Sequence, residues 1–132
     1  MKKLKIRSMI GDDPATEEIF DCEHKIMNGK HMIAYDQPLY GGSARTVITV
    51  EHGRALMLRR PPYDTRLEFT ADSETVGSYY TGIGVQPVKV RSGRVSVDEN
   101  EDNIKIRLHY TLSGIAQNDL SVKLCMIIGG EE

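Results

Sequence analysis

Five residues from the middle of the chain carry side chains suited to holding an anion. They are Tyr35, Arg59, Arg66, Tyr80 and Thr81. A guanidinium pairs with a carboxylate or phosphate through two parallel hydrogen bonds, and tyrosine hydroxyls can complete such a set of donors. A pocket that gathered these residues would suit a small anionic head group. The alternative is that they surround the mouth of the fold and pair with Glu18, Asp36 or Glu68.

A second group of residues forms a basic stripe late in the chain. The apolar residues of Val88–Val90, Ile104–Leu108 and Val122–Leu124 alternate with polar ones and are expected to point inward. The polar set then points outward: Lys89, Arg91, Lys105, Arg107, His109 and Lys123. Like charges on neighbouring strands cost a few tenths to about 1 kcal/mol each unless an anion relieves them.

This stripe predicts an anion-binding face made by Lys89, Arg91, Lys105, Arg107 and Lys123. A solvated surface is the alternative, with partial charge relief from Glu99, Glu101 or Asp119 at the strand ends. The face lacks the aromatic side chains on which single-stranded nucleic acid stacks. RNA therefore stays only one of several anionic partners to consider.

No arrangement of residues indicates catalysis or metal binding. The histidines, at positions 24, 31, 52 and 109, show no metal-ligand spacing, and we expect them to be exposed on strand faces. Gly82-Ile83-Gly84 lacks the third glycine and the following helix of a phosphate-binding loop, so it reads as a strand end or bulge. We expect no enzyme activity, no metal and no cofactor.

The elements that must position these residues are strands. Ile104–Leu112 and Leu120–Ile128 alternate apolar and polar residues almost without a break, and Ser113–Asp119 between them holds turn residues. Further turn signals recur every 10 to 15 residues. They separate strands expected at Lys2–Ile10, Lys30–Asp36, Ala44–Val50, Arg54–Arg59, Thr65–Thr70, Val76–Thr81 and Gln86–Val97. The last is expected to be a pair of strands or one bent strand, with Ser92-Gly93 as a turn or bulge. Pro38 is expected to lie in a connection.

One segment, Asp13–Met27, fits two structures. Asp13-Pro14 is typical of a helix start, and Ile19, Cys22 and Ile26 follow at helical spacing. The same residues can form a strand, and a helix would leave the Asn28-Gly29 hairpin without its first arm. The sequence pattern therefore leaves helix or strand open and favours strand. With it, eight to ten strands form an antiparallel up-and-down β-barrel whose interior is filled or holds one small ligand.

Composition limits the class of protein. At 132 residues, with a net charge near −2, the chain is expected to be a single domain, residues 1–132, and not a protein that coats nucleic acid. Cys22 and Cys125 are expected to be reduced thiols. No secretory signal and no membrane span are recognisable, so we expect a cytoplasmic protein with no membrane partner. Monomer and homodimer both stay open.

The order of these features resembles the YwiB-like family, small bacterial β-barrel proteins of unknown function in the calycin group with lipocalins and fatty-acid-binding proteins. The matching stretches are Ile33–Asp36, Thr46–Val50, Leu56–Arg60, Arg66–Phe69, Gly77–Thr81 with Gly84, and Ile104–Leu112 with Asn118. They cover nearly the whole chain. Pro61-Pro62 departs from the family, where a glycine turn is expected. The resemblance implies a calycin-like barrel, makes Asp13–Met27 a strand, and carries no catalytic residues.

Calycin-like barrels hold a ligand inside, between an apolar wall and a few polar groups. We therefore expect a barrel that binds a small anionic or amphipathic ligand in its interior through Tyr35, Arg59, Arg66, Tyr80 and Thr81. The alternative is a structural or interaction protein that acts through its outer surface, as a homodimer or on an anionic partner such as RNA.

Overall fold

The computed structural model describes residues 2–39, 41–115 and 118–129 of the chain and shows an all-β protein. Ten strands form a closed antiparallel barrel, which confirms the expected fold class. They are β1 (Lys2–Ile10), β2 (Thr16–Met27), β3 (Lys30–Leu39), β4 (Gly42–Glu51), β5 (Arg54–Arg59), β6 (Thr65–Thr70), β7 (Ser73–Tyr80), β8 (Val85–Glu99), β9 (Asn103–Ser113) and β10 (Leu120–Gly129).

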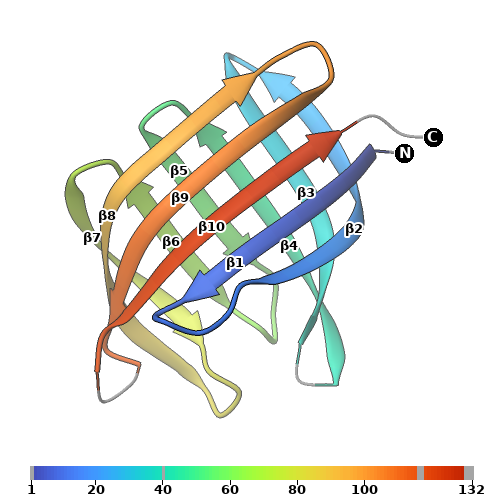
Figure 1. The fold of residues 1–132 in the computed structure, drawn as a ribbon. Coiled ribbons are helices and arrows are strands. Elements are labelled where there is room, and N and C mark those ends of the chain that lie inside the picture. Colours follow the sequence, from blue (N-terminus) through green and yellow to red (C-terminus); the bar gives the residue numbers. More distant parts are fainter. Residues whose placement is uncertain (1, 40, 116–117, 130–132) are drawn as a thin grey trace.

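Each strand lies beside the next one in the chain, and β1 closes the barrel by pairing with β10 (Figure 1). That last pairing runs from Lys3 opposite Gly129 to Ile10 opposite Val122. At one end lie the turns after β2, β4, β6 and β8, together with the start of β1 and the end of β10. We call this the histidine end, because His24 and His31 lie beside the turn after β2, and we call the opposite end the cavity end.

The strict alternation seen in the sequence is the alternation of burial in the barrel wall. The expected inward set on β8, β9 and β10 is buried or packs against the core, which confirms the assignment of inside and outside there. The largest side chains that are almost fully buried are Phe69, Leu4, Ile33, Ile48, Leu67, Ile106, Leu108, Met126 and Ile128. The chain has no Trp and two Phe, so aliphatic side chains form most of this core.

The ambiguous segment is strand β2, as the Asn28-Gly29 hairpin favoured. Asn28 has φ 53° and Gly29 has φ 78°, the positive values that a tight hairpin of this kind requires. Among the described residues, no helix is long and apolar enough to cross a membrane.

One expected boundary needs correction, and one alternative is settled. Pro38 does not break the chain but lies within β3, opposite Ser43 of β4. The other edge of β3 has no strand partner there, so the missing N–H of proline leaves no gap in a ladder. Of the two alternatives for Gln86–Val97, one bent strand is confirmed, because the segment lies within β8, in which the register shifts between Ser92 and Arg94. This β-bulge allows β8 to bend across the barrel.

The barrel wall has two weak seams. Strands β2 and β3 pair only from Glu23 opposite Ala34 to Met27 opposite Lys30, so the remainder of each strand is unpaired with the other. Strands β6 and β7 share one backbone pair, Arg66 opposite Ser78. Side-chain hydroxyls replace part of that ladder, since Thr75 Oγ1 donates to the Glu68 carbonyl and Thr65 Oγ1 accepts from the Tyr80 amide.

The β6–β7 seam makes Gly77 a critical position. A Cβ placed on Gly77 would collide with the carbonyl oxygen of Arg66, which belongs to the backbone and cannot move aside easily. We expect Gly77→Ala to lower the free energy of unfolding by about 1–3 kcal/mol, the usual cost of overpacking. Urea denaturation measures it, and Ser78→Ala is the matched control. Equal stability of the two variants would show that the seam is not closely packed.

Candidate functional site

The cavity end of the barrel interior holds a cavity of about 310 Å³. Its apolar wall comes from Ile6, Ile10, Leu39, Met57, Leu67, Leu112, Ile115, Leu120, Val122 and Leu124. Its polar lining comes from Ser8, Glu18, Tyr35, Gln37, Arg59, Tyr79 and Tyr110. A mostly apolar cavity with a few convergent polar groups is the usual form of a small-molecule site.

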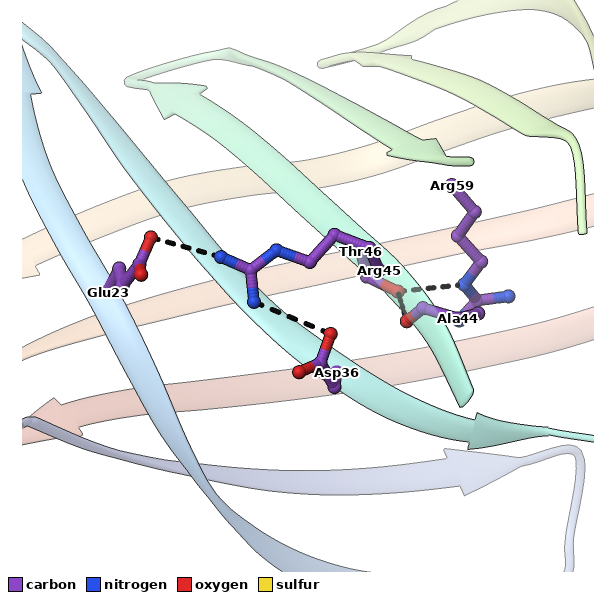
Figure 2. A network of polar contacts seen from close by, with 6 residues as sticks. All are labelled: Glu23, Asp36, Ala44, Arg45, Thr46 and Arg59. Carbon is purple, nitrogen blue, oxygen red and sulfur yellow. Dashed lines mark hydrogen bonds and ion pairs between the residues drawn. The ribbon is translucent and has the colours of Figure 1, made fainter. Parts of the chain in front are cut away.

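Arg59 is the cation of this cavity. It ends β5, where Ala55 and Met57 before it face the core, so the alternation of the strand turns Arg59 inward as well. Its Nε donates to Oγ1 of the fully buried Thr46, 3.2 Å away (Figure 2). Thr46 in turn donates to the Ala44 carbonyl at 3.2 Å. These contacts fix the guanidinium by its Nε.

The rest of the Arg59 guanidinium has no anionic partner. Among the described residues, no carboxylate oxygen lies within 4.0 Å of it, although most other arginines of the barrel wall have one. A partly buried guanidinium without a counter-charge is costly, because burial removes water that is not replaced by an anion. This site is therefore electrostatically incomplete.

Three tyrosines, Tyr35, Tyr79 and Tyr110, line the cavity together with Arg59. Burial raises the pKa of Tyr35, and the adjacent Arg59 guanidinium opposes this rise. Complete burial also raises the pKa of Tyr110 far above the usual tyrosine value, with a further contribution from Tyr79. The Tyr35 and Tyr110 phenols therefore stay neutral at neutral pH and can donate hydrogen bonds into the cavity.

The five residues expected to form the site do not all meet there. Tyr35 and Arg59 line the cavity, whereas Arg66 lies exposed on the outer face of β6. Tyr80 packs against the Tyr63 ring, with centroids 5.5 Å apart, and donates to the Gly82 carbonyl. Thr81 Oγ1 donates to the Gly84 carbonyl at 3.1 Å. Grouping Arg66, Tyr80 and Thr81 with the other two was wrong.

The sequence reasoning missed Tyr79 and Tyr110 as lining residues. Tyr110 could have been found, because it belongs to the inward set of β9 together with Leu108 and Leu112. Tyr79 could not be found in the same way. The apolar Val76 has the opposite parity to Tyr79 in β7, yet its side chain is 73% exposed.

The cavity lies next to the β2–β3 seam. Glu18 of β2 and Gln37 and Leu39 of β3 line it, and all three are in the stretches where these strands do not pair. On the outer face, Arg45 of β4 bridges β2 and β3 (Figure 2). It binds Glu23 of β2 at 3.0 Å and Asp36 of β3 at 3.4 Å, just where backbone pairing stops.

The basic stripe lies on the outer face as expected, but its charges are partly compensated. Arg107 binds Asp98 at 3.1 Å, so the counter-charge comes from the end of the neighbouring strand β8, but from a residue other than the expected Glu99, Glu101 or Asp119. His109 pairs in register with Lys123 on one side and Arg94 on the other. Partial burial lowers the pKa of His109, as do the nearby charges of Arg94, Lys123 and Arg107.

Beside this row the surface has a hollow of about 640 Å³. Its basic lining is Arg91, His109 and Lys123, and its acidic lining is Asp72 and Glu74. Lys89 lines a separate surface hollow with Val76 and Pro87, and Lys105 lies opposite Asp98. The five residues of the predicted anion-binding face therefore do not surround one common point.

The histidines and cysteines differ from expectation in one respect. His31 is buried, with 3% exposure, and is not the exposed strand residue that was predicted. Cys22 is buried inside the barrel, and Cys125 lies opposite the outward-facing Arg7. Both cysteines are free thiols. Within the described part of the chain, no three or more His, Cys, Asp or Glu side chains are arranged to hold a metal ion.

Comparison with known proteins agrees with this fold. A family model described as a domain of unknown function, DUF1934, matches residues 3–125. A crystal structure of the ywiB protein from Bacillus subtilis superposes with a TM-score of 0.83 and 18% sequence identity, over 99% of this chain and 92% of that chain. No curated protein matches the sequence. The recognised YwiB-like resemblance is thereby confirmed at the level of family and fold.

The Arg59–Tyr35 contact predicts the result of an alkaline titration. Since Tyr35 and Tyr110 have raised pKa values, they should ionise after the exposed tyrosines, and stability should fall as pH rises through the ordinary tyrosine range near 10, where only the unfolded chain loses these protons. Arg59→Gln should raise the pKa of Tyr35 further, because it removes the opposing charge. The change in tyrosine absorbance on ionisation measures the titration in the parent protein and in the variant. An unchanged Tyr35 titration in the variant would contradict the contact.

Proposed function

The chain belongs to the DUF1934 family, and we propose that it is a non-enzymatic, cytoplasmic, calycin-like barrel that binds a small anionic or amphipathic molecule inside its cavity end. The anionic group of the ligand would bind Arg59, with the hydroxyls of Tyr35, Tyr79 and Tyr110 as further donors. The apolar part would lie against Met57, Leu67, Leu112 and the adjoining aliphatic wall.

The observation that carries this proposal is the uncompensated charge of Arg59. Thr46 contacts only the Nε of Arg59. No carboxylate of the described residues lies within ion-pair distance of the other guanidinium nitrogens. A bound carboxylate or phosphate would accept two parallel hydrogen bonds from such a guanidinium. Glu18, also on the cavity wall, would face the ligand from the open side and disfavour a second negative charge there.

The size of the cavity limits the ligand. A volume of about 310 Å³ is at the lower end of the range for small-molecule pockets. A water molecule occupies about 30 Å³ in the liquid, so a cavity of this volume would hold roughly ten non-hydrogen atoms. A carboxylate with a chain of about eight carbons satisfies this limit and has both the charge and the apolar body that the cavity suits.

The unpaired lower part of the β2–β3 seam supports a route for such a ligand. Thr16–Cys22 and Tyr35–Leu39 have no backbone bonds to each other that a passing molecule would have to break. Phe20 and Tyr35, whose ring centroids are 5.1 Å apart, mark the inner limit of the opening. The Glu23–Arg45–Asp36 contacts connect β2 and β3 at the point where their backbone pairing begins, which is the other limit of the opening.

Octanoate tests this function. We expect the protein to bind octanoate, and Arg59→Gln to weaken binding about tenfold or more, because hydrogen bonds from a charged donor contribute about 1.5–3 kcal/mol and 1.4 kcal/mol corresponds to tenfold. Isothermal titration calorimetry measures it. Arg66→Gln, on the outer face, should bind like the parent protein, and 1-octanol should bind more weakly than octanoate. Equal loss in both arginine variants, or no preference for octanoate, would refute an Arg59 anion site.

A second candidate function uses the outer surface, as a homodimer or on an anionic partner such as RNA. A specific observation favours the anion: Arg94, His109 and Lys123 form one row across β8, β9 and β10, directly opposite one another. Among the described residues, no carboxylate lies within 4.0 Å of Arg94 or Lys123. An anion in the adjoining hollow would relieve the repulsion in this row.

Polyanion binding tests this second candidate. Affinity for a short RNA should fall steeply as salt increases, since neutralised phosphates release counterions. Lys123→Gln should weaken binding in 50 mM salt, while stability changes by about 0.5 kcal/mol or less, as is usual for exposed positions. Lys25→Gln, exposed on β2, is the control in the same filter-binding assay. No RNA binding at low salt, together with a monomer in sedimentation, would exclude both forms of this candidate.

A further inference from the structure

Four polar side chains form a continuous line of hydrogen bonds across the histidine end of the barrel. Lys2 Nζ lies 2.9 Å from His24 Nδ1, and His24 Nε2 lies 3.0 Å from His31 Nδ1. His31 Nε2 then lies 2.7 Å from Glu99 Oε2. The imidazole planes are within 10° of each other with centroids 5.2 Å apart, as expected for an in-plane hydrogen bond. We call these four residues the histidine chain.

When both imidazoles are neutral, the histidine chain allows only one arrangement of its protons. The Lys2 ammonium can only donate, so His24 Nδ1 must accept. The proton of His24 is then on Nε2 and is donated to His31 Nδ1. His31 in turn carries its proton on Nε2 and donates it to the Glu99 carboxylate. Every contact is satisfied, and each imidazole is fixed in a single tautomer.

The histidine chain connects opposite walls of the barrel. His31 is on β3 and Glu99 is on β8, and four strands separate β3 from β8 in either direction around the barrel. The bend of β8 brings them together, and the Gly53 amide after β4 supports it by donating to the Val95 carbonyl at 3.1 Å. The His31–Glu99 bond therefore crosses the barrel mouth, above a core that includes Ile104 and Ile128.

We propose that the histidine chain is an acid-sensitive clasp that holds this end of the barrel closed at neutral pH and releases it in mild acid. An added proton can enter only at Nδ1 of His24 or Nδ1 of His31, because the other ring nitrogens already carry one. At His24 it would face the Lys2 ammonium, and at His31 it would face the N–H of His24. Two donors then oppose each other, so a proton on His24 releases β1 from the cross-barrel connection, and a proton on His31 releases β2 together with β1.

The charged groups around His24 act in the direction that this clasp requires. Burial is the largest cause that lowers the pKa of His24, followed by the charges of Lys2 and His31, while Glu99 opposes them. Cys22, the inward neighbour on β2, stays a neutral thiol because burial raises its pKa. From β4, β9 and β10 the residues at this level are the apolar Val50, Ile104 and Ile128.

The sign of the pH dependence follows from this direction. A histidine whose pKa is lowered by folding binds fewer protons in the native than in the unfolded state. Its stabilising contribution is complete above the ordinary histidine pKa near 6.5 and is lost as pH falls below that value. The clasp should therefore be closed at pH 8 and weakened at pH 5.

Nitrogen-15 NMR of the imidazole rings tests the clasp directly. At pH 8, both His24 and His31 should show the Nε2–H tautomer. Lys2→Met should make His24 accept its proton at a higher pH than in the parent protein, because the opposing ammonium is gone. Lys5→Met, an exposed lysine on the same strand, should leave the titration of His24 unchanged. An Nδ1–H tautomer at His24, or the same titration in Lys2→Met, would overturn the proposal.

Hydrogen exchange of the Gly53 amide tests whether the mouth opens. After correction for the intrinsic effect of pH, exchange should be about tenfold faster at pH 5 than at pH 8, which corresponds to about 1.4 kcal/mol. His24→Gln keeps one acceptor and one donor but cannot titrate, so it should lose most of this acceleration. His52→Gln, in the exposed turn after β4, should retain it. The same pH dependence in all three proteins would show that the histidine chain does not hold the mouth.

Discussion

Closure of the sheet is the constraint on which the rest of this structure depends. A strand edge presents unpaired N–H and C=O groups, and an up-and-down meander of ten strands removes both edges only if its first and last strands pair. The β1–β10 ladder does this along almost the full length of β1. Once the sheet is closed, every strand has an inner and an outer face, and the period-two pattern of the sequence becomes the division between core and surface.

A closed barrel of ten strands has a wide interior, and this composition cannot fill it completely. Barrel diameter grows with strand number, and eight strands already leave an interior just wide enough for side chains to fill. The chain has no Trp and two Phe. At the histidine end, the bulge at Ser92–Arg94 lets β8 bend toward the turn after β4, which narrows the interior. At the other end a cavity remains.

The sequence correctly predicted those features that follow from the alternation of residues along a single strand. It gave the correct strand character of β2, from the Asn28-Gly29 hairpin, and the correct inward set of β8, β9 and β10. The same alternation would have excluded Arg66, because Thr65 and Leu67 beside it are core residues. It could not identify Tyr79, because the β6–β7 seam has one backbone pair and Val76 is an apolar residue on the outer face.

Contacts between opposite walls were beyond the reach of such reasoning. Glu99 was expected to relieve the outer basic stripe, yet it binds His31 on the other side of the mouth. No local pattern encodes this contact, since it depends on how far β8 bends after its bulge. The parity of β3 did contain a signal for His31, which precedes the inward Ile33 and Tyr35 at intervals of two.

The two ends of the interior show two solutions to the cost of a buried polar group. At the histidine end, donors and acceptors alternate from Lys2 to Glu99, so each nitrogen of the two imidazoles has a partner. Such a network is stabilising because it is complete, and for the same reason one added proton disturbs it. At the cavity end, Arg59 is fixed through Thr46 but has no counter-charge among the described residues. A polar site that is incomplete within the protein gains most from a partner outside it, so a bound anion would neutralise the charge that Arg59 leaves uncompensated.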